Sequence, residues 1–167
     1  MDPRSAWLER AIRRWDQDLM RTAYAYLGDF ALAEDAVQET FLKAWRAYDR
    51  FRGEAEEKTW LMRIAINTCK DVRRSAWFRH IDTGASLDQL PEGAASFTSE
   101  EDAITRAVFS LPTKLREVVI LHCCQGLTGE ETAKVLGISR STVFERMQKA
   151  RAALQRELEG WQDESDR

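Results

Sequence analysis

Apolar residues recur at steps of three and four along most of the chain, a period that predicts α-helices rather than strands. The pattern is sharpest over residues 127–160, where a short helix, a tight turn and a second helix are expected. Thr128 can cap the first of these helices with Glu131, and Gly137 supplies the left-handed residue that ends it. Ser139 is a natural cap for the second helix. The apolar stripe of that helix comprises Val143, Met147, Ala150, Leu154 and Leu158.

Three further helices are expected in the N-terminal half, over residues 6–27, 31–48 and 59–74. A polar, glycine-bearing loop over residues 48–60 separates the last two. The apolar stripes that should face the core comprise Leu8, Ile12, Trp15, Leu19, Ala23 and Leu27 in the first helix, Val37, Phe41, Ala44, Trp45 and Tyr48 in the second, and Leu61, Ile64, Ala65, Thr68 and Val72 in the third.

The periodic pattern stops over residues 75–105, where glycine, serine, proline and acidic residues replace it, a composition typical of a linker. A helix over about residues 100–111 follows, and Pro112 opens another one. One face of that helix carries Leu115, Val118, Val119 and His122. The sequence thus predicts an all-α protein with two small helical domains joined by a flexible acidic linker. The expected layout is a first domain over residues 1–77, a linker over 78–100, a second domain over 101–160 and a tail over 161–167.

The net charge of −3 for 167 residues conceals an uneven distribution. Residues 1–80 carry 15 Lys and Arg against 13 Asp and Glu, residues 81–105 carry none against six, and residues 106–167 carry 10 against nine. The acid is concentrated in the linker. This balance disfavours a protein that coats DNA through its overall charge, and it leaves local basic faces available for DNA.

The chain has no run of about eighteen apolar residues that could span a membrane, and its first residues lack the apolar core of a secretory signal. A cytoplasmic protein is therefore expected. Its three cysteines, Cys69, Cys123 and Cys124, are an odd number, so reduced thiols are expected. His122 precedes two of them in a predicted helix, where neighbours point about 100 degrees apart. We interpret these three consecutive residues as core residues rather than as metal ligands.

The second helix of the 127–160 stretch is basic. Between Arg140 and Arg156 it carries five basic residues and one acid, a net charge of +4. Two short helices joined by a glycine turn, the second one cationic, are typical of the helix-turn-helix, whose second helix enters the DNA major groove. A solvated amphipathic helix would explain the charge but not the cap and the turn. DNA binding is the favoured interpretation.

Residues 126–154 closely resemble region four of the sigma-70 family of bacterial transcription initiation factors, and the match extends upstream through residues 109–126. In that family this unit reads the minus-thirty-five promoter element. The resemblance implies phosphate contacts for Arg146, Lys149 and Arg151. It implies a DNA-binding surface that comprises Arg140, Ser141, Thr142, Glu145, Arg146, Gln148, Lys149 and Arg151. Family members commonly have a lysine and a small polar residue where Phe144 and Glu145 stand, so the resemblance implies the function but not the promoter sequence.

Residues 33–45, AEDAVQETFLKAW, resemble region 2.2 of the same family, which docks on a coiled coil of the polymerase clamp. The resemblance implies a polymerase-binding surface that comprises Asp35, Gln38, Glu39 and Leu42. Without the resemblance, the two acids would be carboxylates on a solvated face.

Residues 59–74 carry a second candidate DNA surface. Off the core stripe lie an aromatic residue, an amide and several cations, which suit unpaired bases and their phosphates. The block resembles regions 2.3 and 2.4, which capture a base flipped out of the minus-ten element and stabilise melted DNA. The resemblance implies a base pocket shaped by Phe51, Arg52 and Gly53. It implies further minus-ten contacts from Trp60, Arg63, Asn67, Lys70, Asp71 and Arg74, with Trp60 partly buried.

With two such regions and little between them, the chain resembles an extracytoplasmic-function sigma factor. The resemblance implies three partners: core RNA polymerase, promoter DNA and an anti-sigma factor. It also implies a binding protein without cofactor, metal or enzymatic activity. The acidic linker either mimics nucleic acid within the polymerase or serves as a solvated tether.

Two other functions compete with this interpretation. A stand-alone dimeric helix-turn-helix regulator explains residues 127–160, but not the face over residues 35–41 or the block over residues 60–74. A Cys/His enzyme requires a thiol nucleophile and either His80 or His122 as its base to converge in one cleft.

Overall fold

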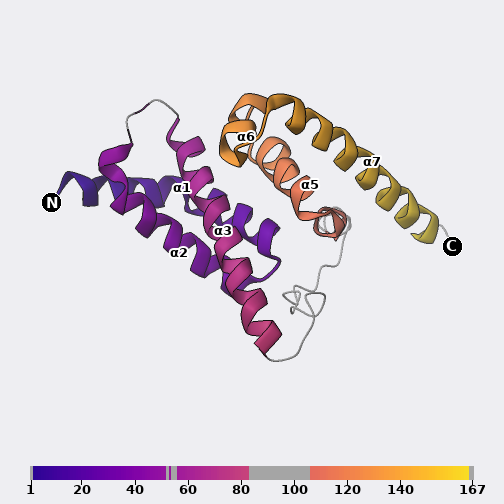
Figure 1. Ribbon diagram of the computed structural model, residues 1–167, viewed down its shortest axis with the longest axis horizontal. Coiled ribbons are helices and arrows are strands. Elements are labelled where there is room, and N and C mark those ends of the chain that lie inside the picture. Colours follow the sequence, from indigo (N-terminus) through magenta and orange to yellow (C-terminus); the bar gives the residue numbers. More distant parts are fainter. Residues whose placement is uncertain (1, 52, 54–55, 83–105, 166–167) are drawn as a thin grey trace. The chain divides into compact units, whose positions relative to one another are not determined.

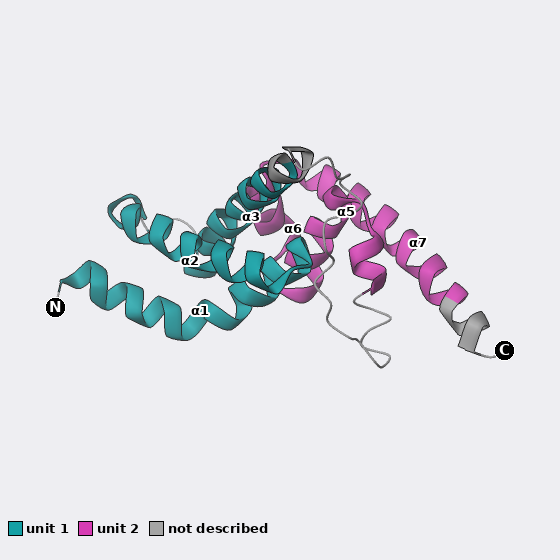
Figure 2. Cartoon of the chain, turned by 90° about the horizontal axis from the view of Figure 1, so that it is seen from below, with its two compact units in different colours: residues 1–94 teal, residues 95–167 magenta. Residues whose placement is uncertain are grey.

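The computed structural model describes residues 2–51, 53, 56–82 and 106–165, with side chains except at residues 78–82 and 161–165. They belong to two compact units, unit 1 within residues 1–94 and unit 2 within residues 95–167 (Figure 2). All regular structure in the described ranges is helical, and no strand occurs there. The predicted all-α class with two helical domains is confirmed. Most of the predicted linker and Arg52 lie outside the described residues.

Unit 1 is built from α1 (Pro3–Leu27), α2 (Phe30–Arg46) and α3 (Glu57–Asp82), with a 3-10 turn, η1 (Tyr48–Arg50), after α2 (Figure 1). Gly28 ends α1 with φ 70°, and its N–H donates to the carbonyl of Tyr24 at 2.8 Å. The Asp29 carboxylate then accepts the N–H of Leu32 at 2.9 Å. These bonds satisfy orphan groups at one helix end and the next helix start, so the chain reverses within two residues.

The core of unit 1 lies where α1, α2 and α3 pack against one another. Its buried residues include Leu19, Ala23, Ala33, Val37, Phe41, Ala44, Leu61, Met62, Ala65, Ile66, Thr68 and Cys69. The predicted stripes of α2 and α3 contribute half of these residues, whereas Ala33, Met62, Ile66 and Cys69 are buried outside those stripes. The predicted stripe of α1 was wrong in part, because Ile12 is 39% exposed while Trp7 and Ala11 are buried. One face of α1 must serve two neighbouring helices, and the spacing along α1 does not reveal that face.

Unit 2 contains a helical segment over residues 106–110, α5 (Thr113–Val118), a π-helix η3 (Val119–Cys124), α6 (Gly129–Leu136) and α7 (Arg140–Ser165). One core cluster joins the first helices to the middle of α7 and comprises Leu111, Val119 and Ala150, with Val108, Leu115, Met147, Ala153 and Leu154 around them. A second cluster joins α5, α6 and α7 and comprises Val118, Ala133 and Val143, with Leu136, Ile138 and Met147 around them. α7 is therefore held along one side only.

The π-helix corrects one prediction. His122, Cys123 and Cys124 are all exposed, so their interpretation as core residues was wrong. The N–H of Gln125 donates to the carbonyl of Ile120, five residues back, at 3.0 Å. Val118 and Val119 are buried as predicted, but this wider winding rotates the following side chains away from the face that an α-helical period predicts, and Ile120 and Leu121 are buried in place of His122.

Two helices extend beyond their predicted ends. α3 continues through residues 78–82, which we expected to begin the linker, and α7 continues through residues 161–165, which we expected to be a tail. The apolar period weakens at both places, and at the second one α7 runs through Gly160, a residue that often ends a helix.

Candidate nucleic-acid interface

The helix-turn-helix forms as its local signals predicted. The Thr128 hydroxyl accepts the N–H of Glu131 at 3.1 Å, and the Glu131 carboxylate accepts the N–H of Thr128 at 3.0 Å. Gly137 has φ 67°, the left-handed conformation that ends α6. The Ser139 hydroxyl accepts the N–H of Thr142 at 3.1 Å and so caps α7. These bonds fix the angle at which α7 leaves α6.

The predicted minus-thirty-five residues lie on the side of α7 opposite the core or at its flanks. Exposed positions comprise Arg140, Ser141, Glu145, Gln148, Lys149 and Arg151, and half-buried positions comprise Thr142 and Arg146. The hydroxyls of Ser141 and Thr142 lie 3.2 and 2.8 Å from that of Ser139. Lys149 pairs with Glu145 one turn earlier at 3.5 Å, an exposed contact of small energetic worth that a phosphate could replace.

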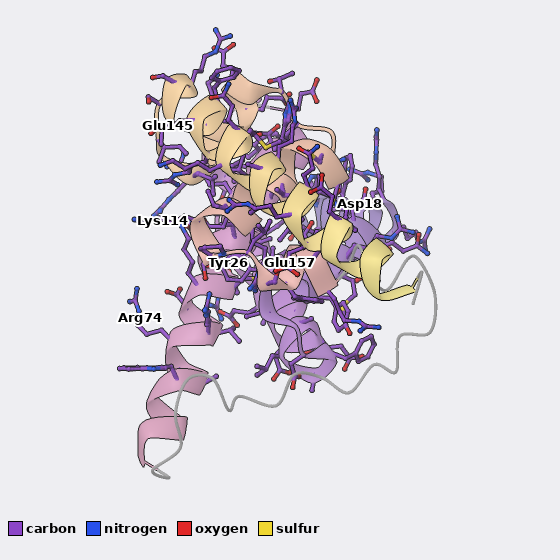
Figure 3. The ribbon with its side chains drawn as sticks, turned by 90° about the vertical axis from the view of Figure 1, so that its right-hand side faces the viewer. Asp18, Tyr26, Arg74, Lys114, Glu145 and Glu157 are labelled. Atoms are coloured by element: carbon purple, nitrogen blue, oxygen red, sulfur yellow. The ribbon has the colours of Figure 1, made fainter. Side chains whose placement is uncertain are left out.

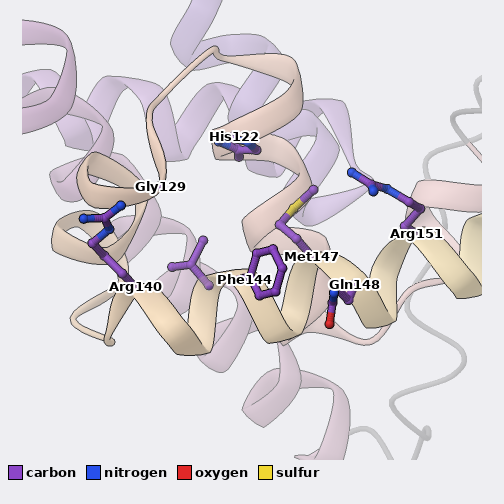
Figure 4. A pocket seen from close by; sticks show the side chains of 8 residues that line it. His122, Gly129, Arg140, Phe144, Met147, Gln148 and Arg151 are labelled. Atoms are coloured by element: carbon purple, nitrogen blue, oxygen red, sulfur yellow. The ribbon is translucent and has the colours of Figure 1, made fainter.

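A hollow of about 370 Å³ lies beside this surface. Its lining comprises His122, Gly129, Arg140, Val143, Phe144, Met147, Gln148 and Arg151. Figure 4 shows the ring of Phe144 and the side chain of Met147 next to each other, between Arg140 and Arg151. Sequence reasoning did not include Phe144 in the interface, although its place on a charged helix was a signal. An aromatic side chain thus stands among cations on the exposed side of α7.

In unit 1, α3 presents the predicted minus-ten residues. Arg63, Asn67, Asp71 and Arg74 are exposed and Lys70 is half-buried. Arg74 projects away from α3 (Figure 3). Asp71 pairs with Lys43 of α2 at 3.5 Å, and Lys43 also donates to the Thr68 hydroxyl at 3.2 Å. One predicted DNA contact therefore also ties α3 to α2.

An aromatic cluster lies at the start of α3, beside the loop that precedes it. The Trp60 ring lies 4.7 Å from that of Phe51 and 5.9 Å from that of Trp7, centroid to centroid. Tyr48 lies 5.3 Å from Trp7. The predicted partial burial of Trp60 is confirmed. Two of the three residues expected to shape the base pocket are described: the Phe51 ring contacts Trp60, and Gly53 is exposed with φ 71°.

Glu57, in the first turn of α3, holds this cluster in place. Its carboxylate accepts hydrogen bonds from Trp15 Nε1 at 2.8 Å and from Trp7 Nε1 at 3.2 Å. Two indoles of α1 are thereby bound to the start of α3. Sequence reasoning missed this residue, because an acid in a polar loop carries no sign of partners 42 and 50 positions earlier.

The predicted polymerase-binding residues share one side of α2. Asp35, Gln38 and Leu42 are exposed and Glu39 is half-buried. Leu42 is 46% exposed, which leaves an apolar side chain between polar ones on this face.

The thiols differ in environment. Burial raises the pKa of the Cys69 thiol to about 12. Burial also raises the pKa of the Cys123 thiol, and the positive charge of Arg151 lowers that pKa by a smaller amount. His122 Nδ1 lies 2.7 Å from the carbonyl oxygen of Leu127, and because a carbonyl only accepts, this nitrogen donates. Among the described residues no group of three His, Cys, Asp or Glu side chains is placed to hold a metal ion.

Comparison with known proteins accounts for both units. The profile of Sigma-70 region 2 matches residues 7–79, and that of Sigma-70, region 4, matches residues 101–154. The ECF RNA polymerase sigma-E factor of Escherichia coli (strain K12) is 33% identical over 139 residues, which cover 75% of this chain and 73% of that protein. The probable RNA polymerase sigma-C factor of Mycobacterium bovis is 35% identical over 150 residues, 88% and 80% of the two chains.

The chain belongs to the sigma-70 family. Within it, the chain is a sigma factor of the extracytoplasmic-function type, as predicted. It binds core RNA polymerase and directs transcription initiation at promoters. The match of both halves overturns the stand-alone regulator, which accounted for the C-terminal half alone. Sigma factors are non-enzymatic initiation factors.

Two solved structures resemble this sigma factor over nearly its whole length. The sigma factor RpoE from Bartonella quintana, in complex with the anti-sigma factor NepR, has a TM-score of 0.77 at 26% identity and covers 90% of this chain and 96% of that one. CnrH, in complex with the cytosolic domain of CnrY, has a TM-score of 0.69 at 27% identity and covers 92% and 88%. No described helix combines the length and apolar character needed to cross a bilayer.

Proposed function

We propose that α7 reads the minus-thirty-five element of the promoter. Arg146, Lys149 and Arg151 contact phosphates, whereas base edges are read from positions near Arg140, Ser141, Glu145 and Gln148. The observation that carries this proposal is the one-sided packing of α7, which leaves the basic residues of segment 140–156, whose net charge is +4, exposed or half-buried. Thr142 belongs to the same proposed surface, and its backbone N–H also completes the helix cap.

We propose that unit 1 captures and holds the melted minus-ten element. Phe51, Arg52 and Gly53 shape a pocket for one flipped base, with Trp60 against it. The single strand then follows α3 along Arg63, Asn67, Lys70, Asp71 and Arg74. Extruding a base costs a few kcal/mol, and stacking of about 1–3 kcal/mol per base offsets that cost, so melting needs no chemical step from this chain. We accordingly propose that the chain catalyses no reaction and needs no cofactor.

A third surface, on α2, docks on the clamp coiled coil of core RNA polymerase. It consists of Asp35, Gln38, Glu39 and Leu42, and the half-exposed Leu42 supports this role because burial of its side chain would favour association. Leu42→Ala should weaken co-purification with core polymerase, while Ile12→Ala, which removes a similarly exposed aliphatic side chain from α1, should not. Equal retention of both variants would contradict the α2 surface.

We further propose that an anti-sigma factor controls this chain. The two similar structures were solved with an anti-sigma factor and with a partner's cytosolic domain. Affinity purification from the native cell under non-inducing conditions should recover a stoichiometric protein that blocks transcription in vitro. Full activity whenever the chain is expressed, without such a protein, would contradict this control. We also propose that these functions are divided along the chain as the sequence predicts: a first domain over residues 1–77, a linker over 78–100, a second domain over 101–160 and a tail over 161–167.

Transcription in vitro tests the DNA surfaces. The purified chain is added to core RNA polymerase lacking any sigma factor, on fragmented genomic DNA, and transcript starts are sequenced. We expect starts that share paired upstream elements and that disappear with Asn67→Ala or Arg146→Ala. Arg13→Ala on α1 is a matched control, since it removes an exposed cation outside all three surfaces. Starts that persist in both variants would contradict the assigned surfaces.

A further inference from the structure

Phe144 is the most exposed large apolar side chain among the described residues, at 65%. It does not belong to either core cluster of unit 2, where Val143, Met147 and Ala150 supply the contacts of α7. A phenyl ring in water is unfavourable, and nothing in the folding of unit 2 requires it at this position. Its position therefore favours a contact made outside the chain.

The neighbours of Phe144 indicate what that contact is. Arg140, Phe144, Gln148 and Arg151 follow one another at steps of four, four and three, so they share one side of α7. They also line the same hollow (Figure 4). Two guanidinium groups flank the phenyl ring along this row, and guanidinium groups suit phosphates. If Arg140 and Arg151 contact the phosphates that border a DNA groove, the Phe144 ring between them faces the base edges in that groove.

We propose that Phe144 contacts the 5-methyl group of a thymine in the upstream promoter element. The inference rests on the proposed entry of α7 into the major groove. There, cytosine presents an amino donor, guanine presents two acceptors, and adenine presents an acceptor and a donor, but thymine adds a methyl group. The Phe144 ring makes no hydrogen bonds, so against guanine, cytosine or adenine it would remove water from the polar base edge without replacing its hydrogen bonds. Against thymine it would bury the methyl group, which is favourable. Phe144 therefore selects thymine at one position of the element.

Deoxyuridine provides the test, because it lacks only the methyl group of thymine. Holoenzyme is assembled from core polymerase and the full chain, and a promoter is chosen from the mapped transcript starts. Each thymine of its upstream element is replaced in turn by deoxyuridine, on either strand, and binding is measured by competition. One replacement should weaken binding by wild-type holoenzyme about fourfold, the factor that corresponds to about 0.8 kcal/mol for one buried methyl group.

Three variants make the result specific. Phe144→Ala should bind thymine and deoxyuridine promoters equally, and Phe144→Leu should keep part of the difference. Lys149→Gln should weaken binding to every promoter alike while retaining the full fourfold ratio. Because Phe144 lies outside the core clusters, Phe144→Ala should unfold at the same temperature as the wild-type chain.

Several outcomes would overturn the inference while leaving the proposed function intact. These are paired promoter elements without any methyl-sensitive thymine, an element without thymine, and a fourfold ratio that persists in Phe144→Ala. A Phe144→Ala variant that loses only its affinity for a co-purified protein inhibitor would assign the ring to a protein contact instead. Absence of transcript starts from wild-type holoenzyme would contradict the proposed function itself.

Discussion

Glu57 lies between two tryptophans of α1 and the start of α3, and replacing it by alanine should destabilise unit 1. The substitution removes the acceptor of two hydrogen bonds, from Trp15 Nε1 at 2.8 Å and from Trp7 Nε1 at 3.2 Å. The two donors differ in their access to water. Trp7 is only 7% exposed, whereas Trp15 is half-buried, so the indole N–H of Trp15 can bind water once the carboxylate is gone.

The magnitude follows from that difference. A buried donor left unsatisfied costs about 1–3 kcal/mol, and a donor that regains water loses only the net value of its bond, about 0.5–1.5 kcal/mol. Loss of an acid from the first turn of α3 adds about 0.3–1 kcal/mol. The expected loss is roughly 2–5 kcal/mol, a large part of the 5–15 kcal/mol that is typical of a whole domain. Glu57→Gln keeps one acceptor oxygen and should lose less.

Urea unfolding of the full chain, followed by tryptophan fluorescence, measures this loss. Tryptophan reports mainly on unit 1, which contains all the tryptophans except Trp161. Glu34→Ala is the matched control, since it removes the same charge from an exposed position on α2. Equal stability of Glu57→Ala and Glu34→Ala would refute the reasoning, because it would mean that the two indole bonds contribute nothing net.

Three further predictions concern other parts of the chain. The buried Thr132 hydroxyl has no hydrogen-bond partner among the described residues, so Thr132→Val should stabilise unit 2 by about 1 kcal/mol in thermal unfolding followed by circular dichroism. Destabilisation would show that the hydroxyl is satisfied. Gly137→Ala should lower the stability of unit 2 by about 1 kcal/mol in the same assay, and Gly137→Asn by less, because φ 67° disfavours a side chain although the space around Gly137 is free. Equal stabilities of the wild-type chain and Gly137→Ala would contradict this account. A pKa of about 12 instead of 9.0 lowers the thiolate fraction of Cys69 about a thousandfold at neutral pH. A maleimide should therefore label only Cys123 and Cys124 in the native chain, as measured by mass spectrometry. Labelling of Cys69 without denaturant would contradict its burial.

The helix-turn-helix could be predicted from sequence because its signals are local. Thr128 and Glu131 are three residues apart, and Gly137 and Ser139 act on their immediate neighbours. Such bonds form between groups that the chain keeps close in any case, so residue type and spacing are enough to predict them. The exposed face of α7 follows for the same reason, since its apolar stripe is regular.

Features that depend on contacts between distant segments were predicted poorly. Glu57 meets Trp7 and Trp15 only because α1 and α3 pack together, and the buried face of α1 is chosen by two neighbours at once. The π-helix exposes His122, Cys123 and Cys124, although α-helical spacing places His122 on the predicted core face of its helix.

The sequence by itself therefore determined the helices, their caps, the division into two helical units and, through its resemblance to the sigma-70 family, the function. These properties rest on short-range periodicity and on bonds within one turn or two. Tertiary structure alone decided which face of α1 is buried, which acid joins which tryptophans and which way the side chains of the π-helix point. Those outcomes depend on packing between segments far apart in the chain, and the free energy of such packing belongs to the assembled unit rather than to any one stretch of residues.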